Sequence, residues 1–461
     1  METVEAYLAR KNEELELLNS FLCDPLTIRY PRSVAEVIEH KFHLAAALKA
    51  EHALNDWAFT ETAWAHSGLP RSGPFEFKYD YQRADLDVRG PSFYPFENWL
   101  SSKTVYAASG MAAISALLMA TAPVFSEADI VTMPNSYGET TELIDRHARH
   151  LRRTELGASL AETARSPGSR PRILLLDSCT SAGAFEAVLK CARPRLDLLI
   201  FDTTCFSSGS GRIRRAVSWA RTASIPTVLL RSHTKLDSLG VEYGRLGSAV
   251  FAHCERDGDA KGQLLQGLLT EMQNAVRLFG GAALPAHFPP YVGSRAYRSL
   301  TNRRVAAMLR NGRRTARYFA TALAGLSAEL HFAHGLYLTL APARALDENA
   351  ARETTAALCA DLGRDGLPLR HAGSFGFDFG AAEWSQDRVR NRYVIRIAVA
   401  DLPTSLWDEV VSAVAAWWKR HERRGGRTPF VVPVADMRDP KTTAKSCRAD
   451  RVRVTISGDA P

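Results

Sequence analysis

The sequence has few cysteines and no closely paired ones. Its 461 residues include seven cysteines, an odd number, and no two of them form a CxxC pair. This pattern rules out a small disulfide scaffold and gives no reason to expect a zinc site, so no bound metal is predicted. Scattered, reduced thiols are typical of a cytoplasmic protein.

Signals for secretion and membrane insertion are also missing. Residues 1–16 are acidic and amphipathic, without the basic start and apolar run of a signal peptide. Residues 106–125 contain no charge and are long enough on paper to span a bilayer, but they are rich in alanine and include Gly110 and Pro123. This stretch predicts a buried helix instead. We expect a cytoplasmic protein that does not contact membranes.

A concentrated positive charge of the kind that binds nucleic acid is absent as well. The net charge is +8 at pH 7, but it is spread over the whole chain. Residues 301–330 are basic and helical in pattern, yet no aromatic residues interleave with their arginines, so they predict the solvated face of a long helix. We expect no nucleic-acid partner.

What the sequence does contain is an alternation of short apolar runs with helix-like stretches. Five runs resemble buried strands, and they are residues 129–133, 173–177, 198–202, 227–230 and 247–251. Helix-like stretches lie between them, for example residues 111–120 and 212–221. Strands that are apolar throughout and alternate with helices predict an α/β fold with a mostly parallel sheet covered on both faces.

Other segments predict parts that surround this sheet. Residues 1–70 have the spacing of helices, and residues 71–100 are rich in proline, glycine and aromatics, which is typical of an ordered loop. Strand-like segments at 336–340 and 393–400, and a helix at 405–420 with Trp417 and Trp418 in its core face, predict a smaller α+β domain. The expected division is an N-terminal helical extension (1–75), a large domain (76–300), a C-terminal small domain (301–425) and a basic, loosely ordered tail (426–461).

The most informative segment for chemistry is Ser232-His233-Thr234-Lys235, which follows the apolar run 227–230. A lysine just past a strand end, flanked by two hydroxyl side chains, suits the covalent attachment of pyridoxal phosphate. Its amine can reach the cofactor aldehyde while the hydroxyls donate to the phosphate. A surface lysine that happens to follow a strand is the alternative interpretation.

Two further segments suit the same cofactor. Asp202 ends the run 198–202, where a carboxylate can pair with the pyridinium nitrogen and keep the ring an electron sink. A turn or helix-capping aspartate is the alternative. Ser109-Gly110-Met111 opens a predicted helix whose first amides can bind phosphate, unless Ser109 is an ordinary N-cap.

Tyr137 and Arg396 are candidates for the reacting end of such a site. Tyr137 follows the run 129–133, where its ring can lie over the cofactor and its hydroxyl can carry protons, although a plain loop tyrosine fits as well. Arg396 is flanked by apolar residues of a predicted strand and therefore needs a buried partner. A substrate carboxylate and a structural ion pair explain that arginine equally well.

Taken together and in this order, these segments resemble the Cys/Met-metabolism group of fold type I pyridoxal-phosphate enzymes, the relatives of cystathionine γ-synthase, cystathionine γ-lyase and methionine γ-lyase. The resemblance runs from Tyr79 to Ala400. Its eight ordered matches are Tyr79-Asp80-Tyr81-Gln82-Arg83, Ser109-Gly110-Met111, Tyr137-Gly138-Glu139-Thr140, Asp177-Ser178-Cys179-Thr180-Ser181-Ala182, Asp202-Thr203-Thr204, Ser232-His233-Thr234-Lys235, Ser374-Phe375-Gly376 and Arg396-Ile397-Ala398.

The resemblance implies a role for each matched residue. Lys235 would bind the cofactor aldehyde covalently, Asp202 would hold the pyridinium, and Tyr137 would stack on the ring. The remaining cofactor-binding residues would be Ser109, Gly110, Met111, Ser181, Thr204, Ser232 and Thr234, with Tyr81 and Arg83 reaching the phosphate of a neighbouring subunit. Ser374, Phe375 and Arg396 would take the substrate carboxylate. A homodimer or homotetramer with shared active sites follows from the role of Tyr81 and Arg83.

Departures from the family pattern bear on the reaction. Ser181 stands where the family has an asparagine that contacts the cofactor's 3′-oxygen, and Asp237 falls where the family has a glycine pair and a histidine. These differences favour a specialised-metabolism enzyme that catalyses β- or γ-elimination, or γ-replacement, on a γ-substituted L-amino acid. One specific hypothesis is the formation of a terminal-alkyne amino acid from a γ-chlorinated unsaturated one.

Three alternatives stay open from the sequence. The same lysine and arginine would serve an aminotransferase. A transsulfuration-type cystathionine or methionine γ-lyase or synthase matches the family more literally. A non-catalytic protein with this fold, acting as a binding partner, is a third class, but it would not need to keep both Lys235 and Asp202.

Overall fold

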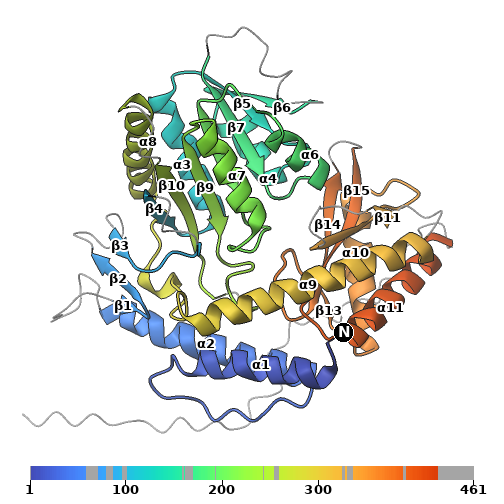
Figure 1. The fold of residues 1–461 in the computed structure, drawn as a ribbon. Helices are drawn as coiled ribbons and strands as arrows, with labels where there is room; N and C mark the ends of the chain where they lie inside the picture. The colour runs from blue at the N-terminus through green and yellow to red at the C-terminus, as the bar shows by residue number, and fades with distance from the viewer. Residues whose placement is uncertain are drawn as a thin grey trace, which may run out of the picture.

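The computed structural model describes most of the chain (Figure 1). The described residues are 2–58, 71–78, 87–95, 101–157, 160, 170–192, 194–241, 243–253, 259–323, 328–329, 336–387 and 391–423. Two predicted site residues, Tyr81 and Arg83, and the predicted tail 426–461 lie outside them.

The larger sheet has seven strands in the order β4-β10-β9-β8-β7-β5-β6. The strands are β4 (Ser101–Ala107), β5 (Ala128–Thr132), β6 (Leu151–Glu155), β7 (Arg172–Asp177), β8 (Leu198–Asp202), β9 (Thr227–Ser232) and β10 (Gly247–His253). Strands β6, β5, β7, β8 and β9 are parallel, and β10 runs antiparallel between β9 and β4. The predicted mostly parallel sheet is confirmed, and each of the five apolar runs is one of its strands.

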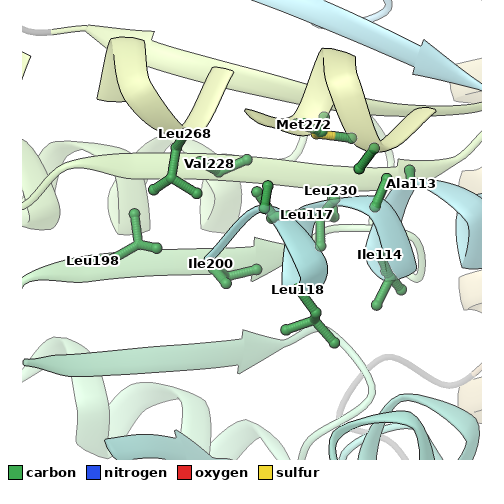
Figure 2. Packing of buried hydrophobic residues seen from close by; sticks show 14 of the residues in the cluster. Ala113, Ile114, Leu117, Leu118, Leu198, Ile200, Val228, Leu230, Leu268 and Met272 are labelled. Carbon is green, nitrogen blue, oxygen red and sulfur yellow. The ribbon is translucent and has the colours of Figure 1, made fainter. Parts of the chain in front are cut away.

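Helices cover both faces of this sheet because the strand side chains are apolar on both sides. The helices are α3 (Gly110–Val124), α4 (Gly138–His147), α6 (Ala182–Leu189), α7 (Gly211–Thr222) and α8 (Asp259–Leu278). Leu198 and Ile200 of β8 point toward α3 and α8, as Figure 2 shows, while Leu199 and Phe201 pack with α6 and α7. Successive side chains of a strand point to opposite faces, so each strand contributes residues to two separate hydrophobic cores.

A second sheet follows in the chain, in the order β11-β12-β15-β14-β13. Its strands are β11 (Ala328–Glu329), β12 (Tyr337–Leu340), β13 (Leu369–His371), β14 (Gly380–Asp387) and β15 (Arg392–Ala398), covered by α10 (Glu348–Arg364) and α11 (Thr404–Arg423). Trp417 and Trp418 are buried in this core, as the sequence predicted. The smaller α+β part of the fold is thus present.

The N-terminal region packs beneath both sheets (Figure 1). It contains α1 (Val4–Asn19), α2 (Val34–Ala58) and a small sheet of β1 (Arg71–Ser72), β2 (Phe75–Lys78) and β3 (Asp87–Arg89). The expectation of a loop over residues 71–100 was therefore wrong for these strands. Phe75 and Phe77 are fully buried against Phe288, near η2 (Pro285–His287), which explains the aromatic content of this segment.

Helix α9 (Arg295–Ala322) joins the two sheets, and Figure 1 shows it running from beneath the larger sheet to the smaller one. Its first turns contribute Tyr297 and Leu300 to the core around α1 and α2, and its end contributes Phe319 to the core of the second sheet. The helix crosses residue 300, where the sequence places a domain boundary, and that boundary stays a prediction.

A buried ionic network ties α1 and α2 to α9 and the second sheet. Its cations are Arg10, Lys11, Lys41 and Arg304, and its carboxylates are Glu14, Asp378 and Asp401. Arg10 Nη2 lies 2.7 Å from Asp401 Oδ1, and Arg304 Nη1 lies 2.5 Å from Asp378 Oδ1. The prediction of a solvated arginine face was wrong for Arg304, because this network buries it.

The stretch 106–125 forms the end of β4 and helix α3 in the interior. Across the part of the chain that the structure describes, no helix has both the length and the hydropathy needed to cross a membrane.

Candidate active site

A cavity of about 830 Å³ opens where the carboxyl ends of β8 and β9 meet the start of α3 and the second sheet. Ligands of parallel α/β sheets typically bind at this edge. Twelve of the predicted site residues line the cavity: Ser109, Gly110, Met111, Tyr137, Asp202, Thr204, Ser232, Thr234, Lys235, Ser374, Phe375 and Arg396. Residues from positions 109 to 396 are thus brought to one place.

Lys235 extends into this cavity just beyond the end of β9. Its Nζ donates a hydrogen bond to Ser374 Oγ and lies 6.0 Å from the centre of the Phe375 ring. Gly376 allows this contact: its φ is +93°, and an added Cβ would lie 2.5 Å from the Lys235 carbonyl oxygen. Only glycine adopts that conformation readily while leaving room for the lysine backbone.

A cradle of donors forms beside the lysine. Ser109 is the N-cap of α3, and its Oγ accepts from Ala112 N at 3.0 Å. The first amides of a helix have no acceptor within it, so those of Gly110 and Met111 can donate to a ligand. Gly110 packs so closely on β9 that an added Cβ would lie 2.7 Å from Ser232 Cβ.

The hydroxyls of the Ser232-Thr234 segment complete the cradle. Ser232 Oγ and Thr234 Oγ1 are 3.1 Å apart and both line the cavity. The amide of Ser232 donates to Thr204 Oγ1 at 3.0 Å, which ties the ends of β8 and β9 together. Amides and hydroxyls that converge in this way form a suitable site for a phosphate group.

Two buried carboxylates lie side by side at the same carboxyl ends of the strands. Asp177 and Asp202 are register partners at the ends of β7 and β8. Burial raises the pKa of Asp202, and burial together with the charge of Asp202 raises the pKa of Asp177 to about 7. Among the described residues, neither carboxylate forms an ion pair, because the nearby Arg231 is committed elsewhere.

Each of these carboxylates holds backbone in place. Asp202 Oδ1 accepts from Thr204 N at 2.9 Å. Asp177 accepts from Tyr137 N and Cys179 N, both at 2.7 Å. Asp177 therefore fixes the loop that carries Tyr137, while Asp202 lines the cavity itself.

The Asp237 departure from the family pattern has a structural explanation. Arg231 and Asp237 form a bidentate ion pair with distances of 2.6 and 2.7 Å, and Arg231 Nη1 also donates to the carbonyls of Thr203 and Phe206. His233 Nδ1 lies 2.8 Å from the same Asp237 carboxylate. Asp237 thus anchors the end of β9 and the turn that carries Lys235.

Tyr137 is poised at the start of α4, with its side chain on the cavity wall. Burial and the carboxylate of Glu139 raise the pKa of its hydroxyl, so it keeps its proton at neutral pH. It can donate a hydrogen bond there but is not a base.

Arg396 forms an ion pair inside the cavity, so the structural interpretation of this arginine is present in the molecule. Its Nη2 lies 2.7 Å from Glu383 Oε1, and its guanidinium lies 5.1 Å from the centre of the Tyr337 ring. Glu383 and Arg396 are register partners on β14 and β15, and both line the cavity. The pair leaves room for a ligand but neutralises the arginine charge.

Among the predicted cofactor residues that the structure describes, Ser181 is the one that does not line the cavity. Its Oγ accepts from Ala184 N at 3.2 Å as the N-cap of α6, and its side chain is exposed. Cys179, two residues earlier, lines the cavity instead, with its Sγ 3.4 Å from Cys205 Sγ. A matched motif could indicate this segment but not which of its side chains turns inward.

Several lining residues were not found from the sequence. They are Lys49, Cys179, Cys205, Arg231, Arg245, His287, Tyr337 and Glu383. They lie on separate elements and share no motif. Glu383 became recognisable only with the fold, because the antiparallel pairing of β14 with β15 places it beside Arg396.

One of the comparisons with known proteins supports the fold. No protein-family model matches the chain, and no curated protein matches it in sequence. Among solved structures, metB from Corynebacterium glutamicum matches with a TM-score of 0.51 and 15% identity, covering 88% of this chain and 97% of that one. This match and the mostly parallel seven-stranded sheet confirm the α/β fold that the sequence predicts.

A second structure is similar at a lower score. It is metY from Campylobacter jejuni, named an O-acetylhomoserine (thiol)-lyase and carrying N'-pyridoxyl-lysine-5'-monophosphate. It matches with a TM-score of 0.47 and 13% identity over 68% of this chain and 82% of that one.

Proposed function

We propose that this protein is a pyridoxal-phosphate enzyme that acts on an amino-acid-type substrate by elimination or replacement at its β or γ carbon. The observation that carries the proposal is one cavity lined by three complementary groups: the amine of Lys235, the anion cradle at Gly110 and Ser232, and the buried carboxylate of Asp202. An aldehyde, a phosphate and a protonated pyridine nitrogen need these three partners.

The residues present fit the cofactor on two structural grounds. A Cβ at position 110 would lie 2.7 Å from Ser232 Cβ, so only glycine lets the first amides of α3 lie this close to the hydroxyls of the cradle. Asp202 is a buried carboxylate with a raised pKa and no ion pair among the described residues, which is the state that a pyridinium would relieve. Lys235, Gly110, Met111, Ser232 and Thr234 would hold the rest of the cofactor.

When bound, pyridoxal phosphate supplies an electron sink for the carbon next to the substrate amine. The chain's own residues position and move protons around that carbon. Lys235, held by Ser374, is the amine that can accept the proton from the substrate carbon. Tyr137 keeps its proton at neutral pH and can donate it toward a departing group.

Reaction products distinguish elimination, replacement and the alternative of transamination. The alkyne hypothesis predicts that 4-chloroallylglycine is converted to propargylglycine with release of chloride. An aminotransferase would instead leave the cofactor stoichiometrically in its amine form after one amino donor. A homodimer or homotetramer with active sites shared through Tyr81 and Arg83 is part of the same proposal.

The decisive experiment is reduction of the purified, cofactor-loaded protein with borohydride, followed by peptide mass mapping. The expected result is a single reduced pyridoxyl adduct on Lys235, absent from Lys235→Ala. Lys261 is a useful control, because it also lies in the described fold but donates to a backbone carbonyl, that of Ser224, and does not line the cavity. An adduct elsewhere, or none at Lys235, would overturn the proposal.

A further inference from the structure

The ion pair of Glu383 and Arg396 determines which substrate groups the cavity can bind at this position. The two residues face each other across β14 and β15, 2.7 Å apart, with most of each side chain shielded from water. Screening by solvent is therefore weak, and the carboxylate of Glu383 cancels most of the positive charge that Arg396 offers. A bare arginine would attract a free carboxylate, whereas this pair presents a donor beside an acceptor.

Arg396 supplies the hydrogen-bond donor of this pair. Its Nε is buried and has no hydrogen-bond partner within the described part of the chain. A buried N–H without an acceptor is costly, so the position favours a ligand that supplies a carbonyl or similar oxygen. The planar guanidinium also stacks over Tyr337, which fixes its orientation.

Glu383 supplies the acceptor of the pair. Its Oε1 accepts from Arg396, and its Oε2 lies against Gly373, where an added Cβ would be 3.1 Å away. Gly373 precedes Ser374, the residue that holds Lys235. An acceptor oxygen therefore lies on the same wall as the reactive amine, close to where the substituent on the substrate's amine-bearing carbon would lie.

We propose that Glu383 is a specificity-determining residue, and that the substrate presents an amide rather than a free carboxylate to the Glu383–Arg396 pair. An amide carbonyl accepts from Arg396 while its N–H donates to Glu383, so both partners keep a hydrogen bond. A free carboxylate would instead meet the like charge of Glu383, which is unfavourable at such distances. The inference rests on the proposed function and narrows its substrate class to amino-acid amides or amide-linked amino-acid units, which disfavours free 4-chloroallylglycine as the substrate.

The test compares two ligands that lack a leaving group, L-norleucine and L-norleucinamide, on the cofactor-loaded protein. Their dissociation constants are measured by calorimetry for wild type and Glu383→Gln, and the ratio of the two constants is compared between the proteins. The comparison between proteins is used because differences between the ligands' own amines are the same in both ratios and cancel when one ratio is divided by the other. Glu348→Gln is the matched control, since Glu348 forms a similar but exposed ion pair with Arg352.

Glu383→Gln is expected to shift the ratio toward the free acid by about tenfold or more, because the like charge disappears while a side-chain amide remains to accept from Arg396. Glu348→Gln is expected to leave the ratio unchanged. An unchanged ratio in Glu383→Gln, with the Lys235 adduct present, would overturn this inference alone. Absence of the Lys235 adduct would overturn the proposed function and this inference with it.

Discussion

Two groups of buried charges in this protein are arranged in opposite ways. The network of Arg10, Lys11, Lys41 and Arg304 with Glu14, Asp378 and Asp401 surrounds each carboxylate with cations. Those cations lower the pKa values of all three carboxylates. The Asp177–Asp202 pair forms no ion pair among the described residues, and burial raises both of its pKa values, at Asp202 against the charge of the nearby Arg231.

The difference separates a structural use of buried charge from a ligand-binding one. A carboxylate surrounded by cations is satisfied before any ligand arrives, so its removal costs stability. A buried carboxylate without a cation is destabilising by itself and becomes favourable only when a positively charged group binds beside it. Asp202 is of the second kind, which is why we assign it to the pyridinium and leave the network out of the chemistry.

The largest expected effect comes from breaking the compensated network. Arg304→Ala removes a cation that contacts Glu14, Asp378 and Asp401, and should lower the free energy of unfolding by about 3–5 kcal/mol because three buried carboxylates lose a partner. Urea denaturation followed by circular dichroism measures this.

The matched control on the same helix is Arg314→Ala. Arg314 pairs with Asp408 at 2.6 Å, but both side chains are more than one third exposed. Its loss should cost less than about 1 kcal/mol, because solvent screens exposed ion pairs. Equal costs for Arg304→Ala and Arg314→Ala would remove the distinction between the network and ordinary surface pairs.

A smaller effect of the opposite sign is expected at the uncompensated pair. A carboxyl whose pKa is raised on folding binds more protons folded than unfolded, so its contribution to stability falls as pH rises. For Asp177 the stability is lost between pH 3.8, the usual pKa of the group, and about pH 7, its pKa in the folded protein. At pH 8 and without cofactor, Asp202→Asn should therefore raise the free energy of unfolding by about 1 kcal/mol, because the variant no longer buries this ionised carboxylate.

The same pair predicts how the cofactor stabilises the protein. A cation bound at Asp202 favours the ionised carboxylate, so cofactor loading should raise the melting temperature of wild type more at pH 8 than at pH 5. Asp202→Asn should reduce this pH dependence and weaken cofactor retention. Identical gains at both pH values in wild type would contradict the assignment of a cation to Asp202.

The smallest effect distinguishes a helix cap from a cofactor ligand. Ser181→Ala removes the N-cap of α6 and should cost about 1 kcal/mol in unfolding free energy. Cofactor retention, measured by absorbance after dialysis, should stay at the wild-type level, because Ser181 does not line the cavity. A loss of retention would restore the role that the family resemblance implies for it.

The fold was predictable where both faces of a strand are buried. The runs that became β7 and β8 are apolar throughout and could be recognised in the sequence. Strand β6 was missed because it is an edge strand with Arg152 and Arg153 in its middle, and β4 because its first half, Ser101 to Thr104, is polar. Edge strands are half solvated, so the hydrophobic signal that marks central strands is absent from them.

The candidate site was predictable where a residue belongs to a local motif. Lys235, Asp202 and Gly110 could be singled out because their neighbours in sequence share the task. Glu383 and Tyr337 could not, since only strand pairing in the second sheet brings them beside Arg396. Arg304 was misjudged for a related reason: a basic helix face predicts solvent unless its acidic partners, remote in sequence, are known.

The buried network also sets an order of events during synthesis. Arg10 and its partner Asp401 are separated by 391 positions. A ribosome that adds about 5–20 residues per second would deliver Asp401 roughly 20–80 s after Arg10. Arg304, which holds the carbonyl of Gly376 at 2.8 Å, links the same network to the turn beneath the reactive lysine. A nascent chain interrupted before residue 401 would therefore lack the carboxylate that pairs with both Arg10 and Lys11 of the first helix.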